Sequence, residues 1–173
     1  DHVIRFWRTS DGTLERTLAA PESEGYVAAF SPDARIALWR RVIPAAPDML
    51  DWLDLGSGKV IAGPYTLKGP IILASFSPDG TRLALVDGNG PVTILDVRSG
   101  QVVGSGIKNP GNLRRVEWSP DGRRLLTEGG NEILVWDATT GTQSLVPLRM
   151  GGDSALVGHW SPDGRFITTR NNK

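Results

Sequence analysis

The chain has 173 residues, of which 39% are hydrophobic, and its 19 basic side chains equal its 19 acidic ones in number. This composition predicts one domain with a sizeable core, and the zero formal net charge argues against a surface built to hold nucleic-acid phosphates. The absence of cysteine excludes disulfides and thiolate chemistry. The sequence contains no apolar run of about 18 residues, the length that would predict a membrane span. We therefore expect neither nucleic acid nor a membrane as a partner. Composition leaves the compartment open, with the cytoplasm favoured.

In chain order, the first predicted elements are two strands, Val3–Arg8 and Leu14–Leu18, joined by a turn at residues 10–12. Three sets of four short strands follow, separated by turns rich in Gly, Pro, Asp and Asn. The sets are expected at Gly25–Phe30, Arg35–Trp39, Leu50–Asp54 and Lys59–Ala62; at Ile71–Phe76, Arg82–Val86, Val92–Asp96 and Gln101–Val103; and at Leu113–Trp118, Arg124–Thr127, Glu132–Asp137 and Thr142–Val146. Residues 155–169 predict two final strands.

One phrase, aromatic-Ser-Pro-Asp, recurs four times between the first and second strands of these sets. Its serines are Ser31, Ser77, Ser119 and Ser161, spaced 46, 42 and 42 residues apart. A period of this length predicts stacked supersecondary units. Gly follows the aspartate in three copies, where it tolerates a positive φ, whereas Ala34 takes that place in the first copy. If Ala34 is left-handed, it costs about 1 kcal/mol.

The two ends of the chain match complementary parts of the repeat. Residues 1–18 correspond to the third and fourth strands of a unit, and residues 155–173 correspond to the first and second. They are therefore predicted to be the two halves of one split unit, so that residues 1–173 form a single array of four unit equivalents. Because the chain begins at Asp1 and not at Met, we expect it to be a piece of something longer or a trimmed chain.

These features resemble a WD40-repeat β-propeller of the bacterial type. The resemblance is carried by the aromatic-Ser-Pro-Asp-Gly turn, by Trp136-Asp137 at the end of a third strand, and by the glycines that close the next turn, Gly12, Gly58, Gly100 and Gly141. It implies an all-β fold of four-stranded antiparallel blades. The family's Gly-His pair before the first strand is missing, so its Asp-His-Ser/Thr-Trp network cannot form in the usual way. TolB-like repeats share the Ser-Pro-Asp-Gly turn, but Trp136-Asp137 favours WD40.

Ring closure has three alternatives, because the resemblance implies seven or eight blades and the chain supplies four. The chain is a fragment of a longer array, or it closes as a four-bladed ring, or two copies form an eight-bladed ring by pairing their terminal strands. The matched halves at the two ends favour the third alternative, a homodimer. An open arc would expose two sheet faces and invite association.

The sequence predicts no catalytic residue, no metal site and no cofactor. The aspartates of the repeated turn are interpreted as turn formers. Residues 56–59 lack the remaining positions of a phosphate-binding loop, and Pro91 cannot serve as a calcium ligand after residues 87–90. His2 and His159 lack the neighbours that a metal site or a Ser-His-Asp triad requires.

Four of the six tryptophans stand at equivalent repeat positions. Trp118 and Trp160 end first strands, and Trp7 and Trp136 end third strands. We therefore expect these four side chains to lie in the core.

The predicted function is a non-catalytic scaffold for protein–protein interaction. The alternative is a half-propeller whose role is to form a ring with its own copy, and a propeller enzyme or a TolB-like periplasmic module is less favoured. The resemblance implies that partners dock on the face made by the second-to-third and fourth-to-first strand connections. An insertion at residues 41–47 interrupts the repeat on that face. The candidate contact residues are Arg40, Arg41, Val42, Ile43, Lys68, Lys108, Asn109 and Arg149.

Overall fold

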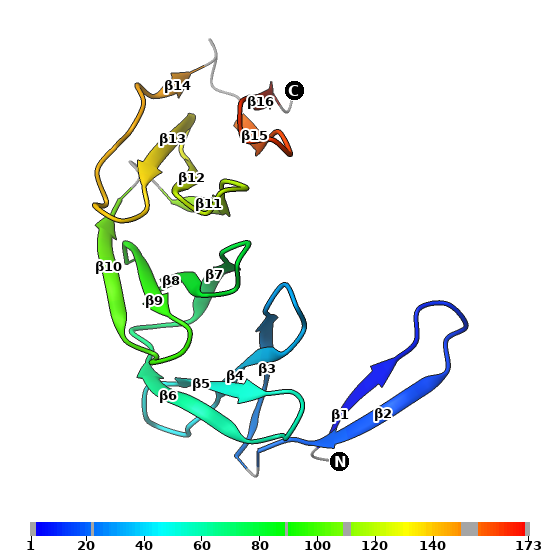
Figure 1. Cartoon of the computed structure of the whole chain (residues 1–173). Coiled ribbons are helices and arrows are strands. Elements are labelled where there is room, and N and C mark those ends of the chain that lie inside the picture. Colours follow the sequence, from blue (N-terminus) through cyan, green and yellow to red (C-terminus); the bar gives the residue numbers. More distant parts are fainter. Residues whose placement is uncertain (1–2, 22, 89, 109–111, 150–155, 172–173) are drawn as a thin grey trace.

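Figure 1 shows the computed structural model of the chain, which describes residues 3–21, 23–88, 90–108, 112–149 and 156–171. The strands are β1 (Val3–Trp7), β2 (Leu14–Ala19), β3 (Gly25–Phe30), β4 (Ile36–Arg41), β5 (Met49–Asp54), β6 (Val60–Thr66), β7 (Ile71–Phe76), β8 (Arg82–Asp87), β9 (Val92–Asp96), β10 (Val102–Ile107), β11 (Leu113–Trp118), β12 (Arg124–Gly129), β13 (Glu132–Asp137), β14 (Leu148–Arg149), β15 (Leu156–Trp160) and β16 (Ile167–Asn171). Within these ranges no helix is long and apolar enough to cross a membrane.

Three sheets of four antiparallel strands form the body of the fold, and each keeps its strands in chain order. They are β3–β6, β7–β10 and β11–β14, and the hairpins β1–β2 and β15–β16 are separate two-stranded sheets. The sheets follow one another along an open arc, with β3, β7 and β11 on its inner side and the two hairpins at opposite ends (Figure 1). The prediction of an all-β fold with four-stranded antiparallel sheets is therefore confirmed.

The repeated Ser-Pro-Asp turn builds the same hydrogen-bond pattern in each copy. In the second copy, Ser77 Oγ donates to Asp79 Oδ1 at 2.6 Å and accepts the Arg82 N–H at 2.9 Å. Gly80 has a φ of 70° and donates its N–H to the Ser77 carbonyl at 2.8 Å. Ala34 adopts a φ of 54°, so the left-handed conformation expected there is present. The aspartate acts in the turn, as its interpretation predicted.

Strand boundaries agree best for the first and third strands of each set. The predicted fourth strand at residues 142–146 is wrong, because only an isolated bridge joins Trp136 to Gln143 and the short strand β14 forms further on. Pro147 lacks the N–H that a continuous ladder would need at that position. Val146 is accordingly exposed, and the segment before β14 lies outside the sheet core.

The core lies between consecutive sheets. Leu38, Leu50 and Trp52 of the first sheet pack against Leu83 and Leu85 of the second, and similar apolar clusters join the later sheets. Burial of this kind is the dominant favourable term in folding. The core expectation is confirmed for Trp118 and Trp136, which are 5% and 9% exposed, whereas Trp160 is half-buried and packs against Leu126 and Ile133.

The expectation is wrong for Trp7, which is 59% exposed. Within the residues that the structure describes, its strand β1 pairs only with β2, and no inner strands lie beside it like those that accompany each equivalent position in the complete sheets.

An arginine clamp repeats at two of the boundaries between sheets. The Arg82 guanidinium carbon lies 4.7 Å from the Trp118 ring centroid, and its Nη2 donates to the Gly122 carbonyl of the next turn. Arg124 repeats this arrangement with Trp160 at 4.7 Å and with the Gly164 carbonyl at 3.2 Å. Each clamp adds a cation–π contact to the apolar packing and fixes one sheet against the next.

Candidate functional site

The second-to-third and fourth-to-first connections lie at the same end of each sheet. This follows from the antiparallel order, as in the first sheet, where Arg41 pairs with Met49 and Met49 pairs with Thr66. The insertion loop, defined here as residues 42–48, joins β4 to β5 at this end. The candidate contact residues that the structure describes therefore lie at the strand ends that share one side of the fold.

Arg40 anchors the insertion loop to the sheet. Its Nε donates to Asp48 Oδ2 at 2.9 Å, its Nη2 donates to the same oxygen, and its Nη1 donates to the Tyr26 hydroxyl. The Arg40 guanidinium is the main reason that the pKa of Asp48 lies below its ordinary value. Asp48 Oδ1 also accepts the Ile43 N–H at 3.3 Å, so one carboxylate joins the two ends of the loop.

Arg41 pairs with a buried carboxylate. Its Nε and Nη2 donate to the two oxygens of Asp51 at 3.0 and 2.7 Å, which is bidentate geometry. The Asp51 side chain is 3% exposed, whereas that of Arg41 is 32% exposed. Arg41 therefore neutralises a charge inside the first sheet, and its guanidinium is held by this structural contact.

The tip of the insertion loop is a hydrogen-bonded turn. Ala46 donates its N–H to the Ile43 carbonyl at 3.2 Å, Pro44 presets its own φ, and Ala45 has a φ of 60°. Val42, which is 40% exposed, presents an apolar side chain beside this turn, while Ile43 is half-buried. The loop thus combines a restrained backbone with an apolar group in solvent.

Hydrogen bonds connect the insertion loop to the next sheet. The Asp48 carbonyl accepts the Leu67 N–H at 2.9 Å, and the following residue, Lys68, donates its N–H to Asp87 Oδ2 at 2.6 Å. Asp87 is buried at the end of β8, and the Lys68 side chain is exposed. Arg40, Arg41, Val42, Ile43 and Lys68 therefore belong to one connected loop surface across two sheets.

The remaining candidates lie farther along the chain. Lys108 is exposed directly after β10, and Arg149 ends β14, where its Nε donates to Glu132 Oε1 at 2.6 Å. Asn109 lies outside the described residues. Sequence reasoning did not identify Tyr26, Asp48 and Asp51 as the partners that hold the two arginines. Their only signal in the sequence was the presence of acidic and aromatic side chains near the insertion.

A second polar cluster joins β11 to β15. Arg115 Nη2 lies 2.9 Å from His159 Nδ1, and Arg115 donates to Glu117 Oε2 at 3.0 Å. The buried Glu128 accepts the Gly158 N–H at 2.6 Å. These groups bind one another across the boundary between two sheets. In the part of the chain that the structure describes, no group of three or more His, Cys, Asp or Glu side chains is placed to hold a metal ion.

Comparison with known sequences supplies no further assignment. No protein-family model matches the chain, and no curated protein matches it with significant similarity.

Proposed function

We propose that the chain is a WD40-like β-propeller module that recognises other proteins through the loops at one end of its sheets. The repeated aromatic-Ser-Pro-Asp turn and the identical strand order of three consecutive sheets support the propeller assignment. So does the hydrogen bond from Trp136 Nε1 to Thr127 Oγ1 at 2.7 Å, because it corresponds to the Ser/Thr-Trp part of the network typical of that family. A rigid stack of sheets that carries variable loops is suited to recognition.

One observation carries the recognition role. The insertion loop departs from the repeat, yet its backbone is restrained at both ends by Asp48 and at its tip by the Ile43–Ala46 turn. An exposed Val42 beside a pre-ordered backbone offers an apolar contact that loses little conformational entropy on binding. The paired Arg40 and Arg41 are less suited to phosphate, because carboxylates already occupy their guanidinium groups.

Protein capture tests the role at the level of single residues. Binders selected from a displayed protein library against the wild-type chain should lose at least tenfold in affinity for V42D, because a charge would replace the apolar contact. Arg98, in the turn between β9 and β10 at the opposite end of the sheets, provides the control variant R98D. If all selected proteins bound the wild type and V42D equally well, the insertion loop would not be part of the interface.

A deletion test should keep Arg41. Removing residues 42–47 with a short Gly linker spares the Arg41–Asp51 pair, whereas removing residue 41 as well would leave the Asp51 carboxylate buried without its partner. The shorter deletion should abolish capture and leave the thermal unfolding of the sheets nearly unchanged.

Self-assembly is the second candidate function. It is favoured by three large apolar side chains, those of Trp7, Phe30 and Phe166, which are 59%, 50% and 63% exposed near the two ends of the arc.

A further inference from the structure

We propose that the hairpin β15–β16 of one chain pairs edge to edge with β1–β2 of a second copy and packs against the sheet β3–β6 of that copy. The two hairpins then complete a four-stranded sheet in the order β15-β16-β1-β2. The evidence lies in the complete sheets of the same chain, which show what covers each repeat position. The proposal is independent of the insertion loop, so either role can fail while the other stands.

The first observation is a hollow beside the inner strands of the first sheet. A hollow of about 400 Å³ lies beside β1 and the first sheet and is lined by Val3 and Ile4 of β1, by Tyr26, Val27 and Phe30 of β3, and by Trp39 of β4. The hairpin β1–β2 covers only part of this sheet, through contacts of Ile4, Phe6 and Leu18 with Ala37, Leu53 and Leu55. The uncovered part belongs to the inner strands β3 and β4, and it is lined mostly by apolar side chains.

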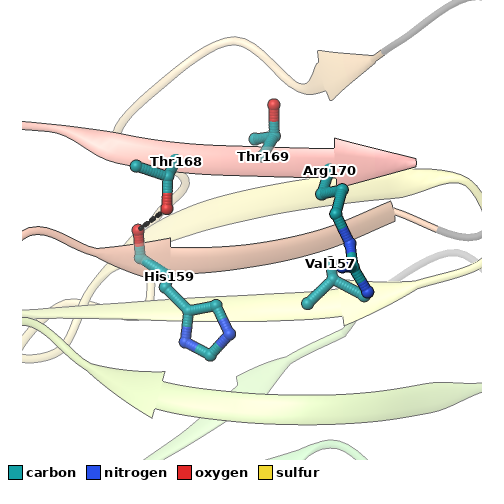
Figure 2. Close-up of a pocket in the computed structure, with 5 residues that line it drawn as sticks. All are labelled: Val157, His159, Thr168, Thr169 and Arg170. Atoms are coloured by element: carbon teal, nitrogen blue, oxygen red, sulfur yellow. Dashed lines mark hydrogen bonds between the residues drawn. The ribbon is translucent and has the colours of Figure 1, made fainter. Parts of the chain in front are cut away.

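The second observation is the exposed hairpin at the other end of the arc. One face of β15–β16 packs on Leu126 and Ile133 through Trp160 and Ile167. A shallow hollow of about 380 Å³ on the hairpin is lined by Val157, His159 and Thr168 to Arg170 (Figure 2). In the preceding sheets, the corresponding face is covered by the next sheet of the arc.

Trp7 is exposed at a repeat position where the equivalent side chains of the complete sheets are buried. Counted back from the turn glycine, its equivalents are Leu53, Leu95 and Trp136, which are 0%, 0% and 9% exposed, against 59% for Trp7. Within the described residues β1 has only β2 as a sheet neighbour, and β16 has only β15. Each hairpin thus has one strand edge at which the complete sheets would have another strand.

Strand register then specifies how the two edges meet. In β12–β13, Leu125 pairs with Trp136 and Thr127 pairs with Leu134, and the same offsets hold in the other two complete sheets. When β16 of one chain is placed beside β1 of the second copy at these offsets, Ile167 pairs with Trp7 and Thr169 pairs with Arg5.

A specific hydrogen bond follows from this register. Trp136 Nε1 donates to Thr127 Oγ1, and the equivalent residues are Trp7 on one terminal hairpin and Thr169 on the other. Figure 2 shows the Thr169 side chain pointing away from His159 and Val157, which line the exposed hollow. The Trp7 indole of the second copy would therefore donate to Thr169 beside Ile167.

The third contact involves two exposed phenylalanines. Five residues after the turn serine stand Ile36, Arg82 and Arg124. Arg82 and Arg124 pack on the aromatic residue before the next turn serine, Trp118 and Trp160, and Ile36 packs against the same apolar cluster as the equivalent Phe76. The same position of the last hairpin is Phe166, and the aromatic residue it would meet in the second copy is Phe30. Their exposures of 63% and 50% fit a contact that one chain leaves unmade.

A second copy is the occupant to which these observations point. Within one chain the two hairpins lie at opposite ends of the arc (Figure 1), whereas two copies related by a two-fold axis offer both ends twice and close both junctions with the same contacts. Four unit equivalents from each chain would then form a ring of eight.

Solution mass over a wide range of concentration is the first test, by size-exclusion chromatography with light scattering. The expected mass is twice that of the 18.7 kDa chain. W7E and F166E should each reduce it to one chain mass, while V103E, a control at an exposed position of β10, should remain a dimer. Because all three side chains are more than half exposed in one chain, the variants should keep the far-ultraviolet circular dichroism of the wild type.

Disulfide trapping tests the register, since the natural chain has no cysteine. Facing residues of an antiparallel pair are close enough for a disulfide, so R5C/T169C should form a covalent dimer on oxidation. The slipped pair R5C/T168C places the two thiols on opposite faces and should not.

Three results would overturn the proposal. They are a single-chain mass at every concentration, a disulfide formed within one chain, and a mass that grows with concentration beyond two chains. The second would identify the chain's own hairpin as the occupant, and the third would indicate open assembly.

Discussion

Trp136 on β13 donates its indole N–H to the hydroxyl of Thr127 on the neighbouring strand β12 at 2.7 Å, and both side chains are buried. The bond satisfies a polar group that has been removed from water. It also binds the second and third strands of the sheet through their side chains, in addition to the backbone ladder between Leu125 and Trp136.

Replacing Thr127 with valine should therefore destabilise the chain. T127V keeps the shape of the side chain but leaves the Trp136 N–H without this acceptor, which costs about 1–3 kcal/mol in the free energy of unfolding. Urea titration followed by tryptophan fluorescence would measure the loss. T127S restores the hydroxyl and should recover most of the stability, and equal losses in both variants would mean that the methyl group matters more than the bond.

Arg41 should matter more for stability than its position beside the insertion loop suggests. R41M leaves the Asp51 carboxylate, which is 3% exposed, without its bidentate partner. Breaking a buried pair on one side costs about 3–5 kcal/mol, and the partial exposure of Arg41 places this loss near the lower figure. The double variant R41M/D51L, assayed by the same urea titration, should recover most of it, and a double variant no more stable than R41M would contradict this explanation.

Ala34 is a site for stabilisation. It holds a φ of 54° where the equivalent residue Gly80 has 70°. A left-handed non-Gly residue costs about 1–2 kcal/mol of stability, which a Gly at this position would recover. The greater conformational freedom of Gly in the unfolded chain offsets about 0.5–1 kcal/mol of that recovery. A34G should therefore raise the free energy of unfolding by about 0.5–1 kcal/mol in thermal or urea denaturation. G80A should have the opposite effect, and a destabilised A34G would show that the methyl group of Ala34 contributes contacts of its own.

Acid should destabilise the repeated turns together. The pKa values of Asp33, Asp79, Asp121 and Asp163 lie below the ordinary value, chiefly because the serine two residues earlier donates a hydrogen bond to each carboxylate. In the unfolded chain each pKa returns to about 3.9, so these bonds contribute stability above that pH. The contribution is lost as the pH falls through the lower values of the folded state.

Urea titrations between about pH 5 and pH 2 would check this dependence. S119A removes the hydrogen bond that most lowers the pKa of Asp121. The free energy of unfolding of this variant should therefore fall less steeply with decreasing pH than that of the wild type. An unchanged slope would assign the acid dependence to other carboxylates.

Part of the candidate site was predictable and part was not. The insertion was visible as a departure from the repeat, and its residues lie at the expected end of the first sheet. The role expected of Arg40 and Arg41 was contact with a partner, whereas their guanidinium groups are held by Asp48 and Asp51. The pairing of β4 with β5 places Arg41 beside Met49, and the residue two positions farther along, Asp51, completes the ion pair.

The sequence by itself determined most of the strands and the local geometry of their repeated turns. Turn chemistry acts over a few residues, so Ser77-Pro-Asp-Gly specifies its own hydrogen bonds, and a period near 42 residues predicts repeated supersecondary units. Only the tertiary structure decided which positions are covered. Trp7 and Trp136 occupy the same place in the repeat, yet one is exposed and the other is buried. Burial depends on which strands lie alongside, and within the described residues β1 has β2 alone as a sheet neighbour, whereas β13 lies between β12 and β14.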